Sequence, residues 1–122
     1  MIWAYRDDKR NTVGFGVLCV CRDHEVHSGG NTHCYIPLLA VNPVYQRRGH
    51  GRRIVEHLIG EAAAVARDLP DCSDILFLDV YVSNTGAISL YEKCGFAIMN
   101  PDLPISDPKE NDELYFVMGK KV

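Results

Sequence analysis

The sequence predicts a mixed α/β fold (α+β in the broader sense), in which the elements follow the order β-β-β-α-β-α-β-β around one central sheet. The first forty residues are rich in strand-forming segments, and two later segments with helical spacing of apolar residues alternate with further strands. Helices that connect the strands in the middle of a chain are typical of such a sheet. With 122 residues the chain can bury one core, so residues 1–122 are expected to form a single domain.

Three strands are predicted in the first forty residues. Ile2–Arg6 is a short strand, and Thr12–Cys21 is a longer one, rich in valine and phenylalanine. Residues 23–32 are polar and contain glycine, which predicts a turn. Residues 34–41 are almost wholly apolar, which predicts a strand covered on both faces.

A helix, a strand and a second helix are predicted next. Apolar residues recur at helical spacing over residues 54–66, and the helix should end near Arg67 because Pro70 and other turn formers follow. Residues 75–82 predict a second buried strand, in which Asp79 is the single charged residue. We expect a short second helix after this strand.

The second helix is expected to begin at a cap around Asn84 and to end at Gly95, a residue typical of helix C-termini. Residues 96–99 and 113–119 then predict the two arms of a hairpin. The intervening residues 100–112 contain three prolines, which predicts an ordered turn or lid rather than a strand.

The composition excludes several classes of function. A net charge of −3 argues against a general nucleic-acid binder. No stretch approaches the roughly 18 apolar residues of a membrane span. The first six residues lack the basic-then-apolar order of a signal peptide, so the expected location is the cytoplasm.

Five cysteines, an odd number that lies mostly within apolar segments, predict free and largely buried thiols. The alternative is a zinc site formed by Cys19, Cys21, His24 and His27. Residues i and i+2 of a strand lie about 6.6 Å apart, whereas two thiolates on one zinc ion converge to under about 4.6 Å. We therefore predict no metal site, although a β-bulge would relieve this geometric conflict.

Residues 46–53, with the sequence QRRGHGRR, form what we call the glycine–arginine loop. Unpaired N–H groups and the helix dipole make the start of a helix a binding site for anions, and this loop precedes one. A nucleotide P-loop is excluded because no lysine follows Gly51. A dinucleotide fingerprint is excluded because Ile54 stands where the third glycine belongs.

Two segments resemble the GNAT superfamily of N-acetyltransferases. Residues 41–51 match its pattern Q/R-x-x-G-x-G/A, and residues 84–96 match its later Asn, Ala, Tyr and Gly-Phe positions. The resemblance covers roughly residues 13–122. It implies the GNAT fold, acetyl-CoA as cosubstrate, and acetyl transfer to a primary amine by direct attack, the amine belonging to a small molecule or a protein N-terminus.

The resemblance also implies the residues that bind the coenzyme, through backbone groups of the strand and loop and through one asparagine: Leu39, Ala40, Val41, Gln46, Arg47, Arg48, Gly49, His50, Gly51, Arg52 and Asn84. A backbone N–H of the strand would stabilise the oxyanion. A side chain at Gly49 or Gly51 would keep the backbone from the phosphates. For the arginines a solvated side chain is the alternative, and for Asn84 a plain helix cap.

Tyr91 corresponds to the general acid of the family. A thiol with a pKa of about 8.5 leaves as an anion, and a phenol with a pKa of about 10 can protonate it. Asp79 is our candidate general base, because a carboxylate within a buried strand is costly without a function or a partner. The alternatives are a tyrosine of the core for Tyr91 and a salt bridge to an arginine for Asp79.

The chain departs from the family pattern in one respect, because the usual domain opens with a strand and helices that wall the acceptor site, and this sequence begins after them. A natural minimal form, a wall from a partner subunit, and truncation remain alternatives. A homodimer and an inactive acyl-CoA-binding module also remain open, as does a ping-pong route through Cys34 or Cys94. An acidic segment from Asp102 to Glu113 could attract a cationic amine, and a solvated loop is the equal alternative.

Overall fold

The computed structural model describes residues 1–22 and 31–122. The elements along the chain are β1 (Ile2–Arg6), β2 (Thr12–Cys21), β3 (His33–Val41), η1 (Pro43–Tyr45), α2 (His50–Asp68), β4 (Ile75–Tyr81), α3 (Thr85–Lys93), β5 (Ala97–Ile98), β6 (Ile105–Asp107), η2 (Pro108–Glu110) and β7 (Glu113–Lys121). The described residues form one mixed seven-stranded sheet with two α-helices, which confirms the predicted fold class. Most of the predicted turn at 23–32 lies outside the described residues.

The expectation that residues 100–112 contain no strand is wrong. Ile105–Asp107 forms β6, which pairs antiparallel with β7 and continues into the short helical turn η2. Pro104 and Pro108 flank this strand rather than interrupt it, so no ladder hydrogen bond is lost to proline. The hairpin between β5 and β7 is confirmed.

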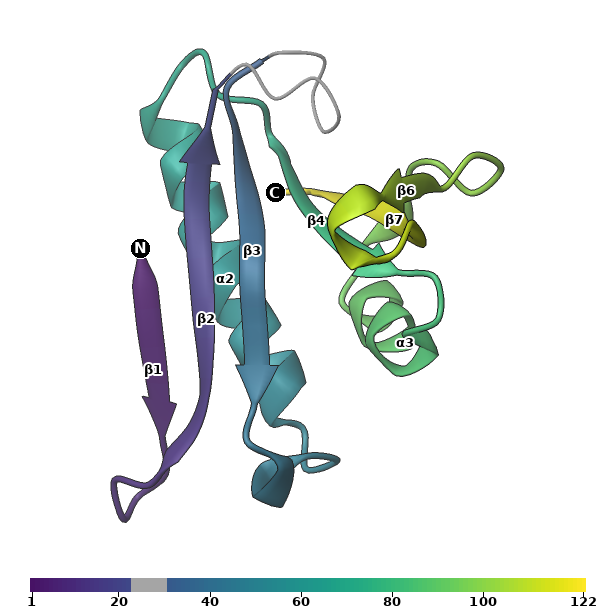
Figure 1. Ribbon diagram of the computed structural model, residues 1–122. Coiled ribbons are helices and arrows are strands. Elements are labelled where there is room, and N and C mark those ends of the chain that lie inside the picture. Colours follow the sequence, from purple (N-terminus) through teal and green to yellow (C-terminus); the bar gives the residue numbers. More distant parts are fainter. Residues whose placement is uncertain (23–30) are drawn as a thin grey trace.

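The sheet divides where β3 and β4 diverge. Their parallel pairing runs from Cys34–Leu76 to Ile36–Leu78 and continues no further, although both strands do. Pro37 follows the last paired residue of β3 and has no N–H with which to extend the ladder. Figure 1 shows β3 continuing along β2 while β4 turns away toward β7 and α3.

This divergence corrects the prediction that β3 is covered on both faces. Its first half is largely buried, whereas Pro37, Leu38 and Ala40 are exposed. Beyond Ile36 the strand has lost β4 as a neighbour, so the apolar composition overstates its burial. Leu39 and Val41 still pack against the core from the side of α2.

The core lies between α2 and the sheet. Ile54, Val55, Leu58 and Ala62 of α2 are fully buried against strand residues such as Leu18. Each such aliphatic side chain contributes on the order of 1.5–3 kcal/mol through removal from water. Among the described residues, no helix has the length and apolar character needed to cross a membrane.

Glycine in β2 allows α2 to approach the sheet closely. A Cβ atom at Gly16 would lie 3.1 Å from side-chain carbons of both Ile54 and Leu58. A Cβ atom at Gly14 would lie 2.3 Å from the carbonyl oxygen of Ala40 on β3. Close packing therefore explains both glycines.

Candidate functional site

The backbone of the glycine–arginine loop turns sharply before α2. Arg47 and Gly49 both have a positive φ, of 64° and 81°. Gly49 is the N-cap of α2, no side chain caps this helix, and its first turn contains no acidic residue. The first N–H groups of an α-helix have no acceptor within the helix. The start of α2 therefore presents backbone donors together with the positive end of the helix dipole, which is the chemistry of an anion site.

The two glycines of the loop serve different physical purposes. A Cβ atom at Gly49 would meet no atom within 4 Å, so its left-handed backbone, rather than crowding by the protein, favours glycine there. The open space beside it is where an anion could approach the amides. A Cβ atom at Gly51 would lie 3.1 Å from Leu90 of α3, so this glycine also permits close packing of the two helices.

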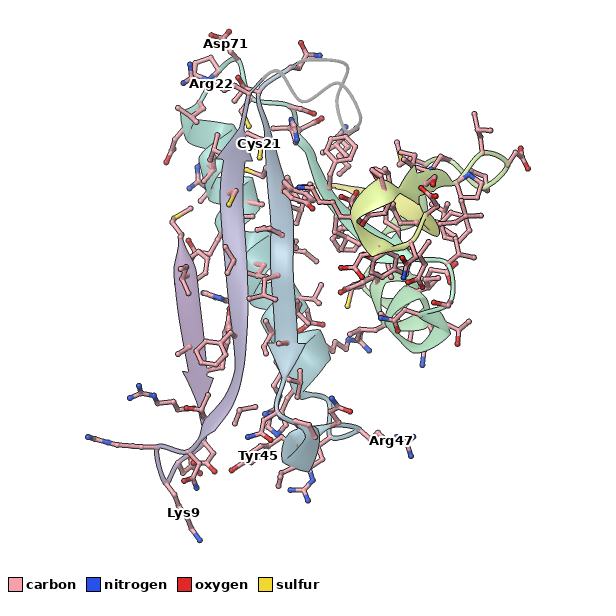
Figure 2. All side chains as sticks on the ribbon, viewed as in Figure 1. Lys9, Cys21, Arg22, Tyr45, Arg47 and Asp71 are labelled. Carbon is pink, nitrogen blue, oxygen red and sulfur yellow. The ribbon has the colours of Figure 1, made fainter. Side chains whose placement is uncertain are left out.

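The side chains of the loop are engaged elsewhere or extend into solvent. The Nε atom of Arg52 lies 2.9 Å from Oε1 of Glu56, and both side chains are more than half exposed. The side-chain amide of Gln46 donates to the carbonyl of Val41 at 3.2 Å. Arg47 and Arg48 are exposed, and Figure 2 shows the Arg47 side chain pointing away from the helices. The start of α2 therefore offers an anion mainly backbone donors.

The second half of β3 offers backbone groups toward the divergence. Leu39, Ala40 and Val41 pair with β2 on one side only. Within the described part of the chain no strand pairs with their other side, because β4 has turned away. In an antiparallel pair alternate residues direct their N–H and C=O groups outward, so this side of β3 can bind an extended ligand.

A cavity of about 470 Å³ lies between the diverging strands, the start of α3 and the segment β6–η2. Its walls are formed by Tyr35, Pro37, Asp79, Val80, Tyr81, Asn84, Tyr91, Ser106, Asp107, Pro108, Lys109 and Tyr115. Three residues singled out in the sequence, namely Asp79, Asn84 and Tyr91, thus line the same cavity.

Tyr91 projects from α3 into this cavity. Burial, with a smaller effect of Cys94, raises the pKa of its phenol above the ordinary value of 10.0. Its ring also packs edge-on against Phe96, with 6.0 Å between the ring centroids. The side chain is therefore both part of the core and part of the cavity wall. At neutral pH its hydroxyl carries a proton that it can donate.

Asp79 is half-buried and accepts a hydrogen bond from the hydroxyl of Tyr35 at 3.0 Å. Burial and the neighbouring Asp79 carboxylate raise the pKa of the Tyr35 phenol, which keeps it a donor. Sequence reasoning missed Tyr35. Its position opposite Phe77 in the β3–β4 register brings it beside Asp79, and that register is not encoded in any local motif.

A second tyrosine–carboxylate pair lies in the same cavity. The hydroxyl of Tyr81 donates to Oδ2 of Asp107 at 3.0 Å. Burial, this hydrogen bond and nearby carboxylates raise the pKa of Tyr81 to about 12. Burial, Asp79 and Asp107 also raise the pKa of Tyr115. In the sequence, Asp107 is one of several acidic residues in a proline-containing segment, and nothing local marks it as a cavity residue. Only the pairing of β6 with β7 places it beside Tyr81.

Asn84 caps α3. Its side-chain oxygen accepts a hydrogen bond from the Ala87 N–H at 3.2 Å, as in the simple cap predicted. Asn84 also lines the cavity, so both assignments remain compatible with its position.

The described residues contain no group of three or more His, Cys, Asp and Glu side chains that could hold a metal ion. All five cysteines are free thiols, as predicted, but only Cys34 is fully buried. Of the four alternative zinc ligands, His24 and His27 lie outside the described residues.

A family profile described as the acetyltransferase (GNAT) family matches residues 1–96. The chain belongs to this family. The GNAT fold expected from the two sequence segments is thereby confirmed.

Among curated proteins, the GNAT chain is 41% identical over 78 residues to [Ribosomal protein bS18]-alanine N-acetyltransferase of Escherichia coli K12, covering 60% of this chain and 47% of that protein. It is 28% identical over 93 residues to N-alpha-acetyltransferase 30 of Saccharomyces cerevisiae, covering 76% and 49%. The chain thus spans about half the length of the curated relatives it matches.

Solved structures agree. The crystal structure of the ribosomal-protein-S18-alanine N-acetyltransferase from Escherichia coli superposes with a TM-score of 0.70 at 25% identity, covering 100% of this chain and 68% of that one. The NatC complex bound to Gag peptide and CoA has a TM-score of 0.78 at 23% identity, covering 99% and 70%. At 23% identity, the similarity to the NatC complex shows a shared fold.

Proposed function

We propose that this chain is an acetyl-CoA-dependent N-acetyltransferase whose acceptor is the α-amino group of a protein N-terminus. The observation that carries the proposal is the convergence of Asp79, Asn84 and Tyr91 on one cavity beside the unpaired edge of β3. Relatives named for acetylation of a ribosomal-protein alanine and of protein α-amines support the choice of acceptor.

The residues present fit the coenzyme. The uncapped start of α2 and the open space at Gly49 suit a pyrophosphate, since a Cβ atom would occupy that space. We assign the amides of residues 47–52 to the phosphates, with Asn84 as a further contact. The backbone of Leu39, Ala40 and Val41 is assigned to the extended arm of the coenzyme, where an N–H would also stabilise the oxyanion.

Acetyl-CoA supplies an activated thioester, and this chain supplies the proton transfers. In our assignment Asp79 takes one proton from the bound ammonium, directly or through water, so that the neutral amine attacks the thioester, and Tyr35 orients the Asp79 carboxylate. The nitrogen loses its second proton as the tetrahedral intermediate collapses, and this proton replaces the one that Tyr91 gives to the thiolate. Tyr91 donates its phenolic proton to the departing thiolate. Its raised pKa keeps that proton available at neutral pH. Binding both substrates together supplies proximity without a covalent enzyme intermediate.

The proposal extends to the setting of the protein. We infer that residues 1–122 act as a single domain in the cytoplasm, where an acceptor on a ribosomal protein would be found. The acceptor is not a nucleic acid. The anion site at α2 is built mainly from backbone groups, which supports a small phosphate ligand over a basic surface for nucleic acid.

The experiment is acetyl transfer to a peptide that begins with alanine. Thiol release from acetyl-CoA and mass spectrometry of the peptide should show one acetyl group at the α-amine. The control peptide has the same sequence with its α-amine already blocked. Coenzyme binding without transfer to any amine would contradict catalysis and support the acyl-CoA-binding module instead.

A further inference from the structure

Tyr45 lies directly before the glycine–arginine loop and contacts two other segments of the chain. It is the last residue of η1, and its hydroxyl donates to Oδ2 of Asp7, in the turn between β1 and β2, at 2.8 Å. Its ring packs edge-on against the ring of His50, the first residue of α2, with 5.7 Å between the ring centroids. Figure 2 shows Tyr45 on the side of η1 that lies toward the β1–β2 turn. Tyr45 therefore links this turn to the start of α2.

Asp7 is held in place by the turn around it. Its Oδ1 atom accepts hydrogen bonds from the N–H groups of Lys9 and Asn11, both at 2.9 Å. Its Oδ2 atom accepts from the side-chain amide of Asn11 at 3.2 Å, in addition to the Tyr45 hydroxyl. Hydrogen bonds, of which that from the Asn11 backbone is the strongest, lower the pKa of Asp7, so the carboxylate is ionised at neutral pH. Asp7 is thus a fixed acceptor for the Tyr45 hydroxyl.

The segment between β3 and the loop is attached to the same region at both of its ends. At one end, the N–H of Asn42 donates to the carbonyl of Val13 on β2 at 2.7 Å. At the other end, the hydrogen bond to Asp7, with smaller effects of burial and of the Asp7 charge, raises the pKa of the Tyr45 phenol. The phenol therefore keeps its donor proton at neutral pH. Residues 42–45 are fixed relative to the start of β2.

The contact between Tyr45 and His50 closes the chain that lies between them. Residues 46–49 connect the two rings, and Arg47 and Gly49 have a left-handed backbone in this stretch. Such a backbone is unfavourable for arginine, and it persists only where the surrounding structure imposes it. A loop whose ends are held also loses less conformational entropy when a ligand orders it. The contact thus favours one arrangement of the amides that precede α2.

The direction of the Tyr45 hydroxyl argues against direct contact with a phosphate. The hydroxyl proton is donated to a carboxylate, whose negative charge would repel an anion at the same place. An effect of Tyr45 on an anionic ligand must therefore pass through the backbone of the loop.

We propose that Tyr45, held by Asp7, is a positioning residue that fixes the glycine–arginine loop in the conformation that binds the pyrophosphate of the coenzyme. This inference rests on the proposed function for the identity of that ligand. Tyr45 takes no part in the proton transfers at Asp79 and Tyr91.

The test compares the binding of coenzyme A with that of pantetheine, which has the same thiol arm but lacks the pyrophosphate and the nucleotide. Dissociation constants are measured by calorimetry, with displacement titrations for weak binding, for Tyr45→Phe, Asp7→Asn and the double variant. Phenylalanine keeps the ring beside His50 and removes only the hydroxyl. Tyr5→Phe is the matched control, because it removes a hydroxyl that bonds Nδ1 of His57 at 2.6 Å, away from the loop. The kcat with saturating acetyl-CoA and an alanine-starting peptide is measured for the same proteins.

We expect Tyr45→Phe to weaken coenzyme A binding about fivefold, the ratio that corresponds to one hydrogen bond of ordinary net strength. Its affinity for pantetheine and its kcat at saturation should change by less than about twofold. Asp7→Asn should have a smaller effect, because the amide oxygen still accepts a hydrogen bond. The double variant should match Tyr45→Phe, since both changes act on one interaction. Tyr5→Phe should leave both affinities unchanged.

Unchanged affinity for coenzyme A in Tyr45→Phe would overturn the inference. Equal weakening of coenzyme A and pantetheine, or a lower kcat at unchanged affinity, would also overturn it, because the hydroxyl would then support the fold or the reaction rather than the loop. Additive effects of Tyr45→Phe and Asp7→Asn would overturn the role of Asp7.

The same measurements separate this inference from the proposed function. A wild type that binds coenzyme A but transfers acetyl to no amine contradicts the proposed catalysis, and the two affinities still decide the role of Tyr45. A wild type that binds coenzyme A no more tightly than pantetheine contradicts both proposals.

Discussion

The two sides of the divergence between β3 and β4 are built in different ways. On the side of α2, the glycine–arginine loop offers backbone N–H groups, while its side chains form surface contacts such as the one between Arg52 and Glu56. On the side of β4 and β7, the cavity is lined by side chains from β3, β4, α3, β6 and β7. The first side needs a particular backbone, and the second needs a particular set of functional groups.

This difference indicates which substitutions matter on each side. On the side of α2, we expect coenzyme binding to tolerate substitutions of exposed side chains. It should be sensitive to any substitution that alters the backbone conformation at Gly49. The cavity is sensitive to the loss of a single hydroxyl or carboxylate. The following experiments test this contrast, in order of decreasing expected effect.

Tyr91→Phe should give the largest effect. Loss of a general acid lowers kcat by about 10²–10⁴-fold, whereas coenzyme affinity should be retained because the ring still packs against Phe96. Tyr5→Phe is the matched control, since that hydroxyl bonds His57 outside the cavity. Steady-state kinetics and calorimetric coenzyme binding provide the two readouts, and an unchanged kcat would remove Tyr91 from the mechanism.

The pH dependence of the wild type tests the same assignment. Because the pKa of Tyr91 is raised above 10.0, the phenol keeps its proton through the neutral range and loses it only as the pH rises through that raised pKa. With a saturating acceptor, kcat should therefore not decline between pH 7 and pH 9 on account of this group. A basic limb in that range which disappears in Tyr91→Phe would contradict the assignment.

Asp79→Asn should lower kcat by about 10²-fold near neutral pH, since the variant cannot take the proton that the bound ammonium must lose before it attacks. The deficit should shrink above pH ~8, where the α-amine loses that proton to water without help. A pH–rate profile of the variant against the wild type measures this. A deficit that is constant across pH would mean that Asp79 has a structural role through Tyr35.

Gly49→Val should weaken coenzyme affinity about tenfold or more. The left-handed backbone at Gly49 disfavours a β-branched residue, and the side chain would occupy the space beside the amides. Gly60→Val is the matched control, because Gly60 also has open space around it but lies within α2 without a positive φ. Equal coenzyme binding by both variants would show that the anion site is assigned to the wrong place.

Arg52→Ala should give the smallest effect, with coenzyme affinity changed by less than about threefold. Its pair with Glu56 is exposed and contributes at most about 1 kcal/mol to stability. Isothermal titration against acetyl-CoA gives the affinity. A loss as large as that of Gly49→Val would show that the coenzyme is bound by side chains, and the contrast between the two sides would disappear.

What the sequence predicts well is what is encoded locally. The start of α2, the cap at Asn84 and the position of Tyr91 on the next helix follow from spacing and from turn chemistry within a few residues. The convergence of Asp79 and Tyr91 could be expected only through the family resemblance.

The remainder depends on pairing between distant strands. Tyr35 meets Asp79 because of the parallel register of β3 and β4, and Asp107 meets Tyr81 because β6 pairs with β7. The three prolines of residues 100–112 argued against a strand, so β6 was not predicted. The uniformly apolar sequence of β3 gave no sign that the strand becomes exposed from Pro37 onward. Neither register nor divergence has a local sequence pattern.

The central claim is that the two sides of the divergence hold both substrates at once. Initial rates measured while acetyl-CoA and an alanine-starting peptide are varied together test it most directly. Lines that intersect in a double-reciprocal plot are the predicted result, because transfer then occurs in a complex of all three molecules. Parallel lines would contradict it, since they would require an acetylated enzyme intermediate, with Cys34 or Cys94 as the candidate carriers.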